Sequence, residues 1–191
     1  MSRERRSILP RRLSPRKLVS LGPKGLAVFL ALLLLGITIE YWEKRTGDFL
    51  EGTVATVVDG DTLVVDVSGD HRRVRLIGVD TPETVHPRKP VQYYGREASD
   101  FTKRSLLGRR VWLEYDVAPL DRYRRHLAYV WLEEPGRSEE AVRRGMFNAR
   151  LLLEGYGRLL TVQPNVRHAD LFTVFQTEAR TAGRGLWGLK R

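Results

Sequence analysis

Residues 50–79 contain three strand-like stretches separated by tight turns, and this pattern limits the possible folds more than any other feature. The first two stretches, residues 50–58 and 62–67, are joined through Asp59-Gly60-Asp61. Asp-Gly fills turn positions that need a positive φ angle, so the segment predicts a β-hairpin. The third stretch, residues 71–79, alternates charged with apolar or small positions. The folded part of the chain is therefore expected to begin as β structure.

Further along the chain, two more stretches have strand character and three have helical periodicity. Each predicted helix is followed by a glycine, the residue that most readily ends a helix in the left-handed conformation. The predicted strands cover residues 111–117 and 127–132, and the predicted helices cover residues 94–107, 148–154 and 166–182.

Asparagine is a preferred N-cap residue, so Asn148 and Asn165 are the candidate N-caps of the last two helices. Residues 133–145 fit either an insertion loop or a short helix capped by Ser138. The order of elements predicts an α+β domain over residues 50–189, built as a five-stranded Greek-key barrel with about three helices. The chain has no cysteine, which excludes disulfides, thiolate zinc sites and cysteine nucleophiles.

The formal net charge of +10 is concentrated at the N-terminus of the chain. Residues 1–24 carry eight Lys or Arg and one Glu, a balance of +7, and residues 43–191 carry only +4. A nucleic-acid-binding face would need clustered basic residues within the folded domain. The net charge alone is therefore no evidence for such a face.

Residues 25–39 form an uncharged run that includes four consecutive leucines. As a helix this run spans about 22 Å, and a hydrocarbon core is roughly 30 Å thick. Leu18, Val19 and Leu21 extend it if Lys24 snorkels, which favours a single transmembrane helix over residues 25–42. A cleaved signal peptide is the alternative, although no A-x-A pattern follows.

The charge on each side of this apolar run predicts its orientation. Cytoplasmic flanks carry an excess of Lys and Arg, so residues 1–24 are expected to form a basic cytoplasmic tail. Residues 43–49 then serve as a linker, and the folded domain faces the periplasm or the exterior.

Two carboxylates are predicted at neighbouring strand ends. The turn explains Asp59-Gly60 but not Asp61, which begins the next strand. The third strand ends at Asp80-Thr81-Pro82-Glu83, where Pro82 restricts Thr81 to an extended conformation. Two carboxylates and a carbonyl oxygen are hard ligands that suit Ca²⁺, and a third carboxylate can take a proton from water. A surface network of arginines and carboxylates is the alternative interpretation.

Two arginines near these carboxylates can bind a phosphate. Arg75 precedes Asp80 on the same predicted strand, and its planar guanidinium matches phosphate oxygens. Asp121-Arg122-Tyr123-Arg124-Arg125-His126 reads either as a charged turn or as a second phosphate site. In the second case Arg125 stands at the strand entrance and Tyr123 offers a flat surface for a base.

Several motifs occur in a fixed order along the predicted domain. They are Val-Asp-Gly-Asp-Thr at 58–62, Arg-Leu-Ile-Gly-Val-Asp-Thr-Pro-Glu-Thr at 75–84, His-Pro at 86–87, Tyr-Gly-Arg-Glu-Ala at 94–98 and Leu-Ala-Tyr-Val at 127–130. This series resembles the staphylococcal nuclease (thermonuclease) family. The resemblance extends from about residue 50 to residue 188 and includes Gly-Arg-Gly-Leu-Trp at 183–187.

The resemblance implies an OB-type barrel with three helices and Ca²⁺-dependent hydrolysis of DNA and RNA, which leaves a 5′-hydroxyl and a 3′-phosphate. By motif, Asp61, Asp80 and the Thr81 carbonyl fall where the family holds Ca²⁺. Arg75 and Arg125 match the arginines on the scissile phosphate, and Glu83 matches the general base. The candidate substrate-binding residues are Lys89, Arg122 and Tyr123.

The chain departs from the family pattern in two places. Arg124 stands where glycine is usual, and His126 stands where a small residue is common. Residues 156–165 lack the tyrosines that stack on the base in some members, which bears on base preference more than on hydrolysis.

The partners expected on this interpretation are a DNA or RNA substrate and a membrane, with the chain taken as a monomer. A non-catalytic barrel that only binds nucleic acid or a protein is the alternative function. All five candidate metal, base and arginine side chains are present, which favours the enzyme.

Overall fold

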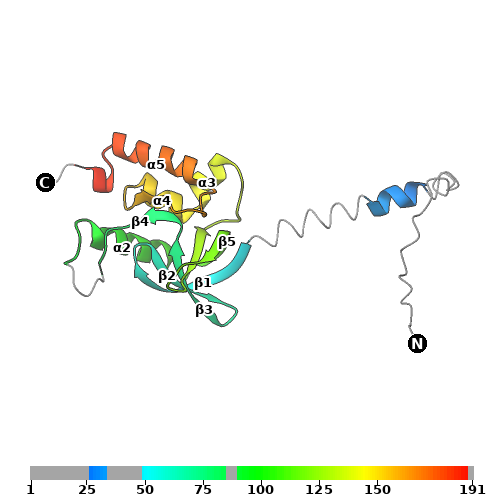
Figure 1. Ribbon diagram of the computed structural model, residues 1–191, viewed down its shortest axis with the longest axis horizontal. Coiled ribbons are helices and arrows are strands. Elements are labelled where there is room, and N and C mark those ends of the chain that lie inside the picture. Colours follow the sequence, from blue (N-terminus) through cyan, green and yellow to red (C-terminus); the bar gives the residue numbers. More distant parts are fainter. Residues whose placement is uncertain (1–25, 34–48, 85–89, 189–191) are drawn as a thin grey trace, which may run out of the picture. The chain divides into compact units, whose positions relative to one another are not determined.

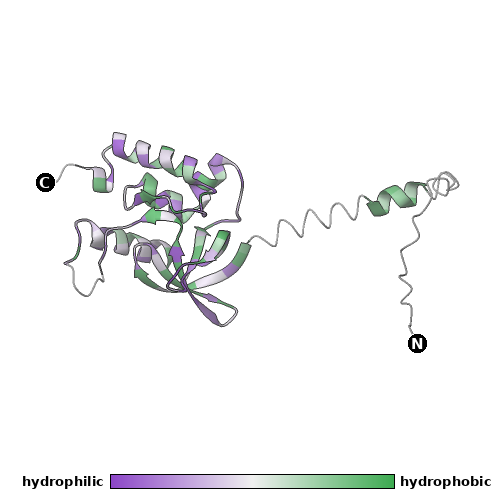
Figure 2. Ribbon diagram, viewed as in Figure 1, coloured by the Kyte–Doolittle hydropathy of each residue, from purple (hydrophilic) through white to green (hydrophobic). Residues whose placement is uncertain are grey.

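The computed structural model describes residues 26–33, 49–84 and 90–188. The chain divides into two compact units, residues 1–46 and 47–191, and the folded domain lies in the second. In the first unit, residues 26–33 form a helix of apolar residues (Figure 2). None of the helices in the described residues combines the length and apolar character needed to cross a membrane. The remainder of the predicted span over residues 25–42, the tail at 1–24 and nearly all of the linker at 43–49 lie outside the described residues.

The second unit contains the predicted five-stranded barrel, in an α+β fold (Figure 1). Its strands close in the order β1-β2-β3-β6-β5, with a parallel pair between β3 and β6 and antiparallel pairs elsewhere. The strands are β1 (Phe49–Asp59), β2 (Thr62–Val67), β3 (Asp70–Leu76), β5 (Arg110–Leu120) and β6 (His126–Trp131). Inward-facing side chains such as Leu63, Val65 and Val74 are completely buried. Their burial explains the alternation seen in the sequence.

The strand predicted over residues 71–79 is two strands, and the reason lies at Gly78. β3 ends at Leu76, and the separate β4 (Gly78–Asp80) pairs with β7 (Arg158–Leu160) in a second small sheet. Gly78 has a φ of 77°, and a Cβ atom on it would lie 2.6 Å from the Phe172 ring. The chain can therefore turn out of the barrel only at a glycine.

The described part of this domain also contains four α-helices and one 3₁₀ helix, more than the three expected. They are α2 (Gly95–Leu106), α3 (Glu139–Gly145), α4 (Phe147–Leu153), α5 (Ala169–Thr181) and the 3₁₀ helix η2 (Gly185–Trp187). α3 occupies the region that was ambiguous between loop and helix. The Ser138 hydroxyl accepts a hydrogen bond from the Ala141 N–H at 3.1 Å, so Ser138 is its N-cap, as in the second of the two alternatives.

The two asparagines predicted as N-caps instead connect distant segments. Asn148 lies inside α4, where its side-chain amide donates to the Ile77 carbonyl at 2.8 Å and its oxygen accepts from the Val130 N–H at 2.9 Å. The Asn165 side chain bonds both backbone groups of Ala118, at 2.7 and 2.8 Å. Buried backbone groups without a strand partner need such bonds, and a side chain from another element provides them.

Glu114 on β5 is a buried carboxylate whose ion pairs lie apart from the predicted catalytic residues. It accepts hydrogen bonds from the Trp131 indole at 2.8 Å and the Arg167 guanidinium at 2.7 Å, and its oxygen lies 3.3 Å from His168 Nε2. Burial alone would raise its pKa, but the hydrogen bonds from His168, Arg167 and Trp131 lower it overall. The Glu114 carboxylate is thus stabilised in its charged form and links β5 to the start of α5.

Candidate active site

The hairpin turn between β1 and β2 brings Asp61 against the segment that follows β4. Gly60 is needed here because of this close approach: a Cβ atom on it would lie 2.6 Å from the Thr81 hydroxyl oxygen. The expectation of a positive φ in this turn is wrong, because Gly60 does not adopt the left-handed conformation. The Thr102 hydroxyl also donates to the Gly60 carbonyl at 2.7 Å, which fixes the turn to α2.

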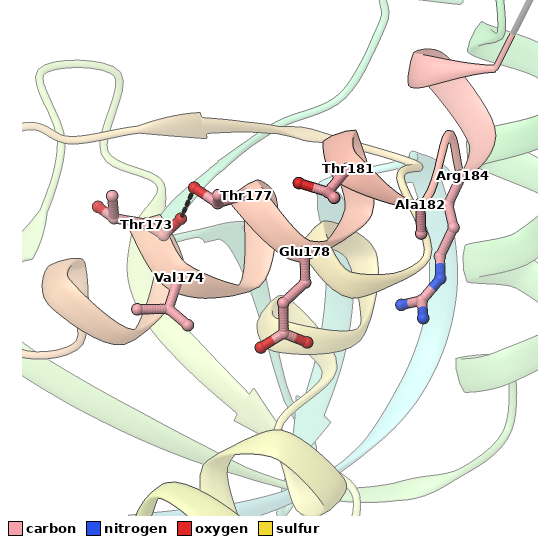
Figure 3. A pocket seen from close by; sticks show the side chains of 7 residues that line it. All are labelled: Thr173, Val174, Thr177, Glu178, Thr181, Ala182 and Arg184. Atoms are coloured by element: carbon pink, nitrogen blue, oxygen red, sulfur yellow. Dashed lines mark hydrogen bonds between the residues drawn. The ribbon is translucent and has the colours of Figure 1, made fainter.

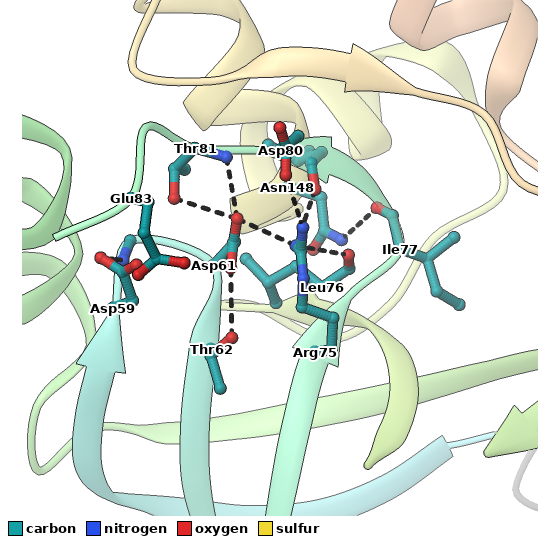
Figure 4. Close-up of polar contacts among 12 residues, drawn as sticks. Asp59, Asp61, Thr62, Arg75, Leu76, Ile77, Asp80, Thr81, Glu83 and Asn148 are labelled. Carbon is teal, nitrogen blue, oxygen red and sulfur yellow. Dashed lines mark hydrogen bonds and ion pairs between the residues drawn. The ribbon is translucent and has the colours of Figure 1, made fainter. Parts of the chain in front are cut away.

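Asp61 is buried and its carboxylate is held by several donors (Figure 4). Its Oδ2 atom accepts from the Thr81 N–H at 2.8 Å and the Thr81 hydroxyl at 3.0 Å, and its Oδ1 atom accepts from the Thr62 hydroxyl at 3.1 Å. Burial raises the pKa of the Asp61 carboxyl, and the Arg75 guanidinium and the Thr81 hydrogen bonds oppose that rise. The side chain is therefore fixed in orientation before any ligand binds.

Arg75 connects the two predicted metal carboxylates (Figure 4). Its Nη1 atom lies 3.0 Å from Asp61 Oδ2, and its Nη2 atom lies 2.9 Å from Asp80 Oδ1. Nη1 also donates to the Val79 carbonyl at 2.8 Å. Only 13% of the Arg75 side chain is exposed, whereas the Asp80 side chain is 56% exposed. The guanidinium is held rigidly, and Asp80 faces the solvent.

Glu83 lies on a segment whose backbone and neighbouring side chain are held by Gln92 and Asp59. Its backbone N–H donates to Gln92 Oε1 at 3.1 Å, and the next residue, Thr84, donates its hydroxyl to Asp59 Oδ1 at 2.7 Å. The Asp59 carboxylate also accepts from the Gly60 N–H at 2.8 Å. Asp59, interpreted only as a turn residue from the sequence, thus anchors the segment that carries Glu83.

Arg125 reaches the same place from the turn before β6, and Asp121 holds it there. The Asp121 carboxylate accepts from Arg125 Nε at 2.7 Å and from the backbone N–H groups of Arg125 and Tyr123 at 2.9 and 2.8 Å. Burial alone would raise the pKa of the Asp121 carboxyl, but the hydrogen bonds from Arg125 and Tyr123 lower it overall. Sequence analysis did not identify this role, although an aspartate that bonds the backbone two residues on is a known turn signal.

Arg124 has a φ of 63°, which explains why glycine is usual at this position in the family that the sequence resembles. The Arg124 side chain is exposed and lines neither cavity described below, so its bulk does not displace Arg125. His126 Nδ1 lies 3.1 Å from the Tyr115 hydroxyl. Burial and the nearby Arg72 lower the pKa of His126.

The predicted metal, base and arginine residues line one polar cavity of about 370 Å³. These residues are Asp61, Asp80, Thr81, Glu83, Arg75 and Arg125. They come from four separate segments of the chain: the β1–β2 turn, β3, the segment from Asp80 to Glu83, and the turn before β6. The fold therefore brings together what the sequence only suggested.

A second cavity of about 520 Å³ adjoins the first and shares Arg75 and Arg125 with it. Arg122 and Tyr123, both predicted to bind substrate, line this second cavity. Tyr123 is 65% exposed, and the Arg122 and Arg125 guanidinium carbons lie 4.8 and 5.5 Å from the centre of its ring. Lys89, the remaining predicted substrate residue, lies outside the described residues.

A third hollow of about 540 Å³ lies along the outer face of α5 (Figure 3). It is lined by uncharged side chains such as Thr173, Val174 and Thr177, together with Glu178 and Arg184. None of the predicted site residues lines it. The chemistry predicted from the sequence is therefore confined to the two cavities that meet at Arg75 and Arg125.

The candidate metal ligands in the polar cavity are oxygen atoms of Asp61, Asp80 and Thr81. Within the described part of the chain, no group of three or more His, Cys, Asp or Glu side chains is placed to hold a metal ion. The predicted ligands are two carboxylates and one backbone carbonyl, a set with the hard character that Ca²⁺ prefers. The chemistry of this set fits Ca²⁺ better than it fits a transition metal, which favours nitrogen or sulfur ligands.

Carboxylates and two arginines that line one cavity of a barrel suit the hydrolysis of phosphodiester bonds, the reaction of a nuclease. Comparison with known proteins gives the family: residues 73–188 match the family described as "Staphylococcal nuclease homologue", and the chain belongs to it. The match covers the barrel from β3 onward and all of the helices that follow.

Several relatives carry nuclease names. The chain is 46% identical to "Thermonuclease" of Staphylococcus hyicus over 134 residues, which cover 70% of this chain and 73% of that protein. It is 47% identical to "Thermonuclease" of Staphylococcus intermedius over 134 residues, 70% and 74% of the two chains. It is 35% identical to "Endonuclease YncB" of Bacillus subtilis (strain 168) over 146 residues, 75% and 64% of the two chains. The chain is thus a nuclease, a hydrolase, as the sequence predicted.

Proposed function

We propose that this nuclease is Ca²⁺-dependent and hydrolyses phosphodiester bonds of DNA, RNA or both at the junction of the two cavities. One observation carries the proposal: Arg75 and Arg125 line both cavities, and the carboxylates Asp61, Asp80 and Glu83 line the polar one. A phosphate at this junction meets two guanidinium groups and the candidate metal ligands together. The adjoining cavity leaves room for the nucleoside attached to it.

Asp61, Asp80 and the Thr81 carbonyl are the proposed Ca²⁺ ligands. Asp61 is already fixed by the Thr81 hydrogen bonds, whereas exposed Asp80 can turn toward a cation. Bound there, Ca²⁺ supplies positive charge that polarises a phosphoryl oxygen. Arg75 lies between both carboxylates and reduces their mutual repulsion while no cation is bound. When Ca²⁺ and substrate bind, the cation would contact the carboxylates and the phosphate would contact Arg75.

Glu83 is the proposed general base. It lines the polar cavity on a segment anchored at Gln92 and Asp59, so its position is set by the backbone. Glu83 takes a proton from water, and the resulting nucleophile attacks the phosphorus opposite the 5′-oxygen. The P–O5′ bond then breaks, the departing 5′-oxygen takes a proton from solvent water, and the products are a 5′-hydroxyl and a 3′-phosphate.

Arg75 and Arg125 stabilise the charge that grows on the phosphoryl oxygens during attack. Both guanidinium groups are held by carboxylates before substrate arrives, which reduces the reorganisation needed in the transition state. Lysine keeps the charge but not the planar fork. We therefore expect kcat to fall by about 10²–10³ in Arg75→Lys, with a much smaller change in KM.

Tyr123, Arg122 and Lys89 are the proposed contacts to the rest of the substrate. The exposed Tyr123 ring offers a stacking surface at the rim of the second cavity. Leu160 and Val162 also line this cavity and are 42% and 59% exposed. They belong to the segment that lacks the base-stacking tyrosines of some family members. On that side the base meets aliphatic groups, so we expect weak discrimination between bases.

The proposal is tested with the purified full-length chain and single-stranded DNA. Degradation should begin when Ca²⁺ is added and stop when a chelator removes it. The Asp61→Asn variant, purified in the same way, controls for contaminating nucleases. Cleavage that persists undiminished in chelator would overturn the metal requirement.

A membrane tether is the second part of the proposal. The uncharged run at residues 25–39 and the +7 balance of residues 1–24 support an anchor with the nuclease domain outside the cytoplasm. Protease added to intact spheroplasts should then remove the domain, and alkaline carbonate should not extract the full-length chain. Protection of the domain would refute the orientation, and a soluble mature protein that begins near residue 39 would indicate a cleaved signal.

A further inference from the structure

Arg73 is an arginine of the polar cavity that sequence analysis did not single out. It lies on β3 two residues before Arg75, and both residues line the polar cavity. Side chains two residues apart on a strand point to the same face and lie roughly 7 Å apart. The residue between them, Val74, is completely buried in the barrel. Arg73 and Arg75 therefore project side by side from the outer surface of the barrel.

The side chain of Arg73 differs from the other two arginines of this cavity in its contacts. Arg75 is held by Asp61 and Asp80, and Arg125 is held by Asp121. Arg73 is exposed, and over residues 26–33, 49–84 and 90–188 its guanidinium makes no hydrogen bond, ion pair or ring contact. An anion can bind it without first breaking an ion pair.

The surroundings of Arg73 would otherwise repel an anion. Four acidic residues line the same cavity: Asp59, Asp61, Asp80 and Glu83. Nucleic acid carries a negative charge at every phosphodiester group, so a cation beside a phosphate strengthens the binding of a strand that crosses this cavity. Arg73 is the one cation of this cavity that no described carboxylate already neutralises.

The position of Arg73 relative to the junction indicates which phosphate of a bound strand lies beside it. Arg75 and Arg125 line both cavities, whereas Arg73 lines only the polar one and Tyr123 only the other. A phosphate at the junction thus has Tyr123 on one side and Arg73 on the other. The spacing of Arg73 and Arg75 along β3 is close to that of neighbouring phosphodiester groups in an extended single strand.

We propose that Arg73 forms a second phosphate-binding subsite, which binds the phosphodiester group next to the scissile one on the side away from Tyr123. This inference rests on the proposed catalytic role of the Arg75–Arg125 junction. It makes the enzyme selective for polymers: a substrate with one phosphodiester group fills only the junction, and a longer strand also reaches Arg73. Arg73 acts in substrate binding and not in the chemical step.

The test compares two ligands that differ in the number of phosphates. The first is a single-stranded 20-nucleotide DNA, for which KM and kcat are measured with Ca²⁺ present. The second is a dinucleoside monophosphate, for which the inhibition constant against the 20-mer is measured. Arg73→Gln should raise KM for the 20-mer about tenfold, since a charge-assisted hydrogen bond to phosphate is lost. The inhibition constant of the dinucleoside monophosphate should rise less than twofold.

A matched variant and a salt series separate this local effect from the general loss of charge. Arg104→Gln removes the same charge from an exposed position on α2 that lines neither cavity, and it should leave both constants as in the wild type. Arg73→Lys should give an intermediate KM. The dependence of log KM on log salt concentration should become shallower by about 0.7 in Arg73→Gln, the value for one phosphate contact on a single strand.

Each other outcome has a definite meaning. If the wild type cleaves the 20-mer but Arg73→Gln and Arg104→Gln give the same KM, the subsite is refuted and the proposed function stands. If both ligands weaken equally in Arg73→Gln, Arg73 binds the scissile phosphate itself, which also refutes the subsite. If the wild type fails to cleave the 20-mer with Ca²⁺, the proposed function is wrong.

Discussion

Replacing Gly78 by alanine should destabilise the domain more than the same change at Gly69. Both glycines have a positive φ, 77° and 89°, so each alanine variant incurs the left-handed strain of about 1–2 kcal/mol. A Cβ atom on Gly69 has no heavy atom within 4 Å, but one on Gly78 would lie 2.6 Å from two carbons of the Phe172 ring. Phe172 is only 1% exposed and cannot move aside, and overpacking of a core adds about 1–3 kcal/mol. We expect losses of about 2–5 kcal/mol for Gly78→Ala and about 1–2 kcal/mol for Gly69→Ala.

The assay is equilibrium urea denaturation of the two variants and the wild type, followed by tryptophan fluorescence. Adding Phe172→Leu to Gly78→Ala replaces the ring with a smaller side chain, so the double variant should lose less stability than the two single losses added together. Nuclease activity should also fall in Gly78→Ala, because the chain turns at Gly78 to deliver Asp80 two residues later. Equal losses in Gly78→Ala and Gly69→Ala would refute the argument, since the collision with Phe172 would then contribute nothing.

Three further predictions concern the site and the buried carboxylate of β5. Asp61→Asn and Asp80→Asn should weaken Ca²⁺ binding and activity with the fold retained, as measured by Ca²⁺ titration and circular dichroism; undiminished activity in both would remove them from the site. Arg125→Lys should lower kcat by about 10²–10³, whereas Arg124→Lys should change it only slightly, and the reverse result would move the assignment by one residue. The lowered pKa of Glu114 adds stability that is present above its unfolded pKa of about 4.3 and is lost as pH falls through the folded value. The stability difference between wild type and Glu114→Gln, measured by urea denaturation at several pH values, should therefore shrink in acid; a difference independent of pH would contradict this.

The barrel could be predicted because its signals are local. The Asp-Gly turn and the alternation on either side of it need no distant contact, and the predicted hairpin matches β1 and β2 closely. The break at Gly78 could not be predicted in this way. In the sequence Gly78 reads as one more small residue in an alternating strand, and only the Phe172 ring, from a distant helix, shows why the strand ends.

The candidate site was partly predictable for the same reason. Motifs identified the groups with evident chemistry, such as Asp61 and Arg75, and the structure places them together. The residues that hold these groups were missed or misassigned. Asparagine is a residue type that often caps helices, but Asn148 donates a hydrogen bond to the Ile77 carbonyl of another segment. From the sequence Asp121 is an ordinary turn residue, and only the structure shows its bond to Arg125. Supporting roles depend on long-range contacts, which a local pattern does not contain.

The parallel pairing of β3 with β6 determines when the two candidate arginines, Arg75 and Arg125, meet during folding. Val74, Arg75 and Leu76 pair with His126, Leu127 and Ala128, about fifty residues further along the chain, and this ladder closes the barrel together with the long-range pairing of β1 with β5. Contacts so distant in sequence form slowly, because the loop between them must be closed first. Arg75 and Arg125 therefore come within reach of one phosphate only when the barrel closes, and partly folded chains should not cleave nucleic acid. The rate at which nuclease activity returns in a refolding experiment therefore reports the rate of barrel closure.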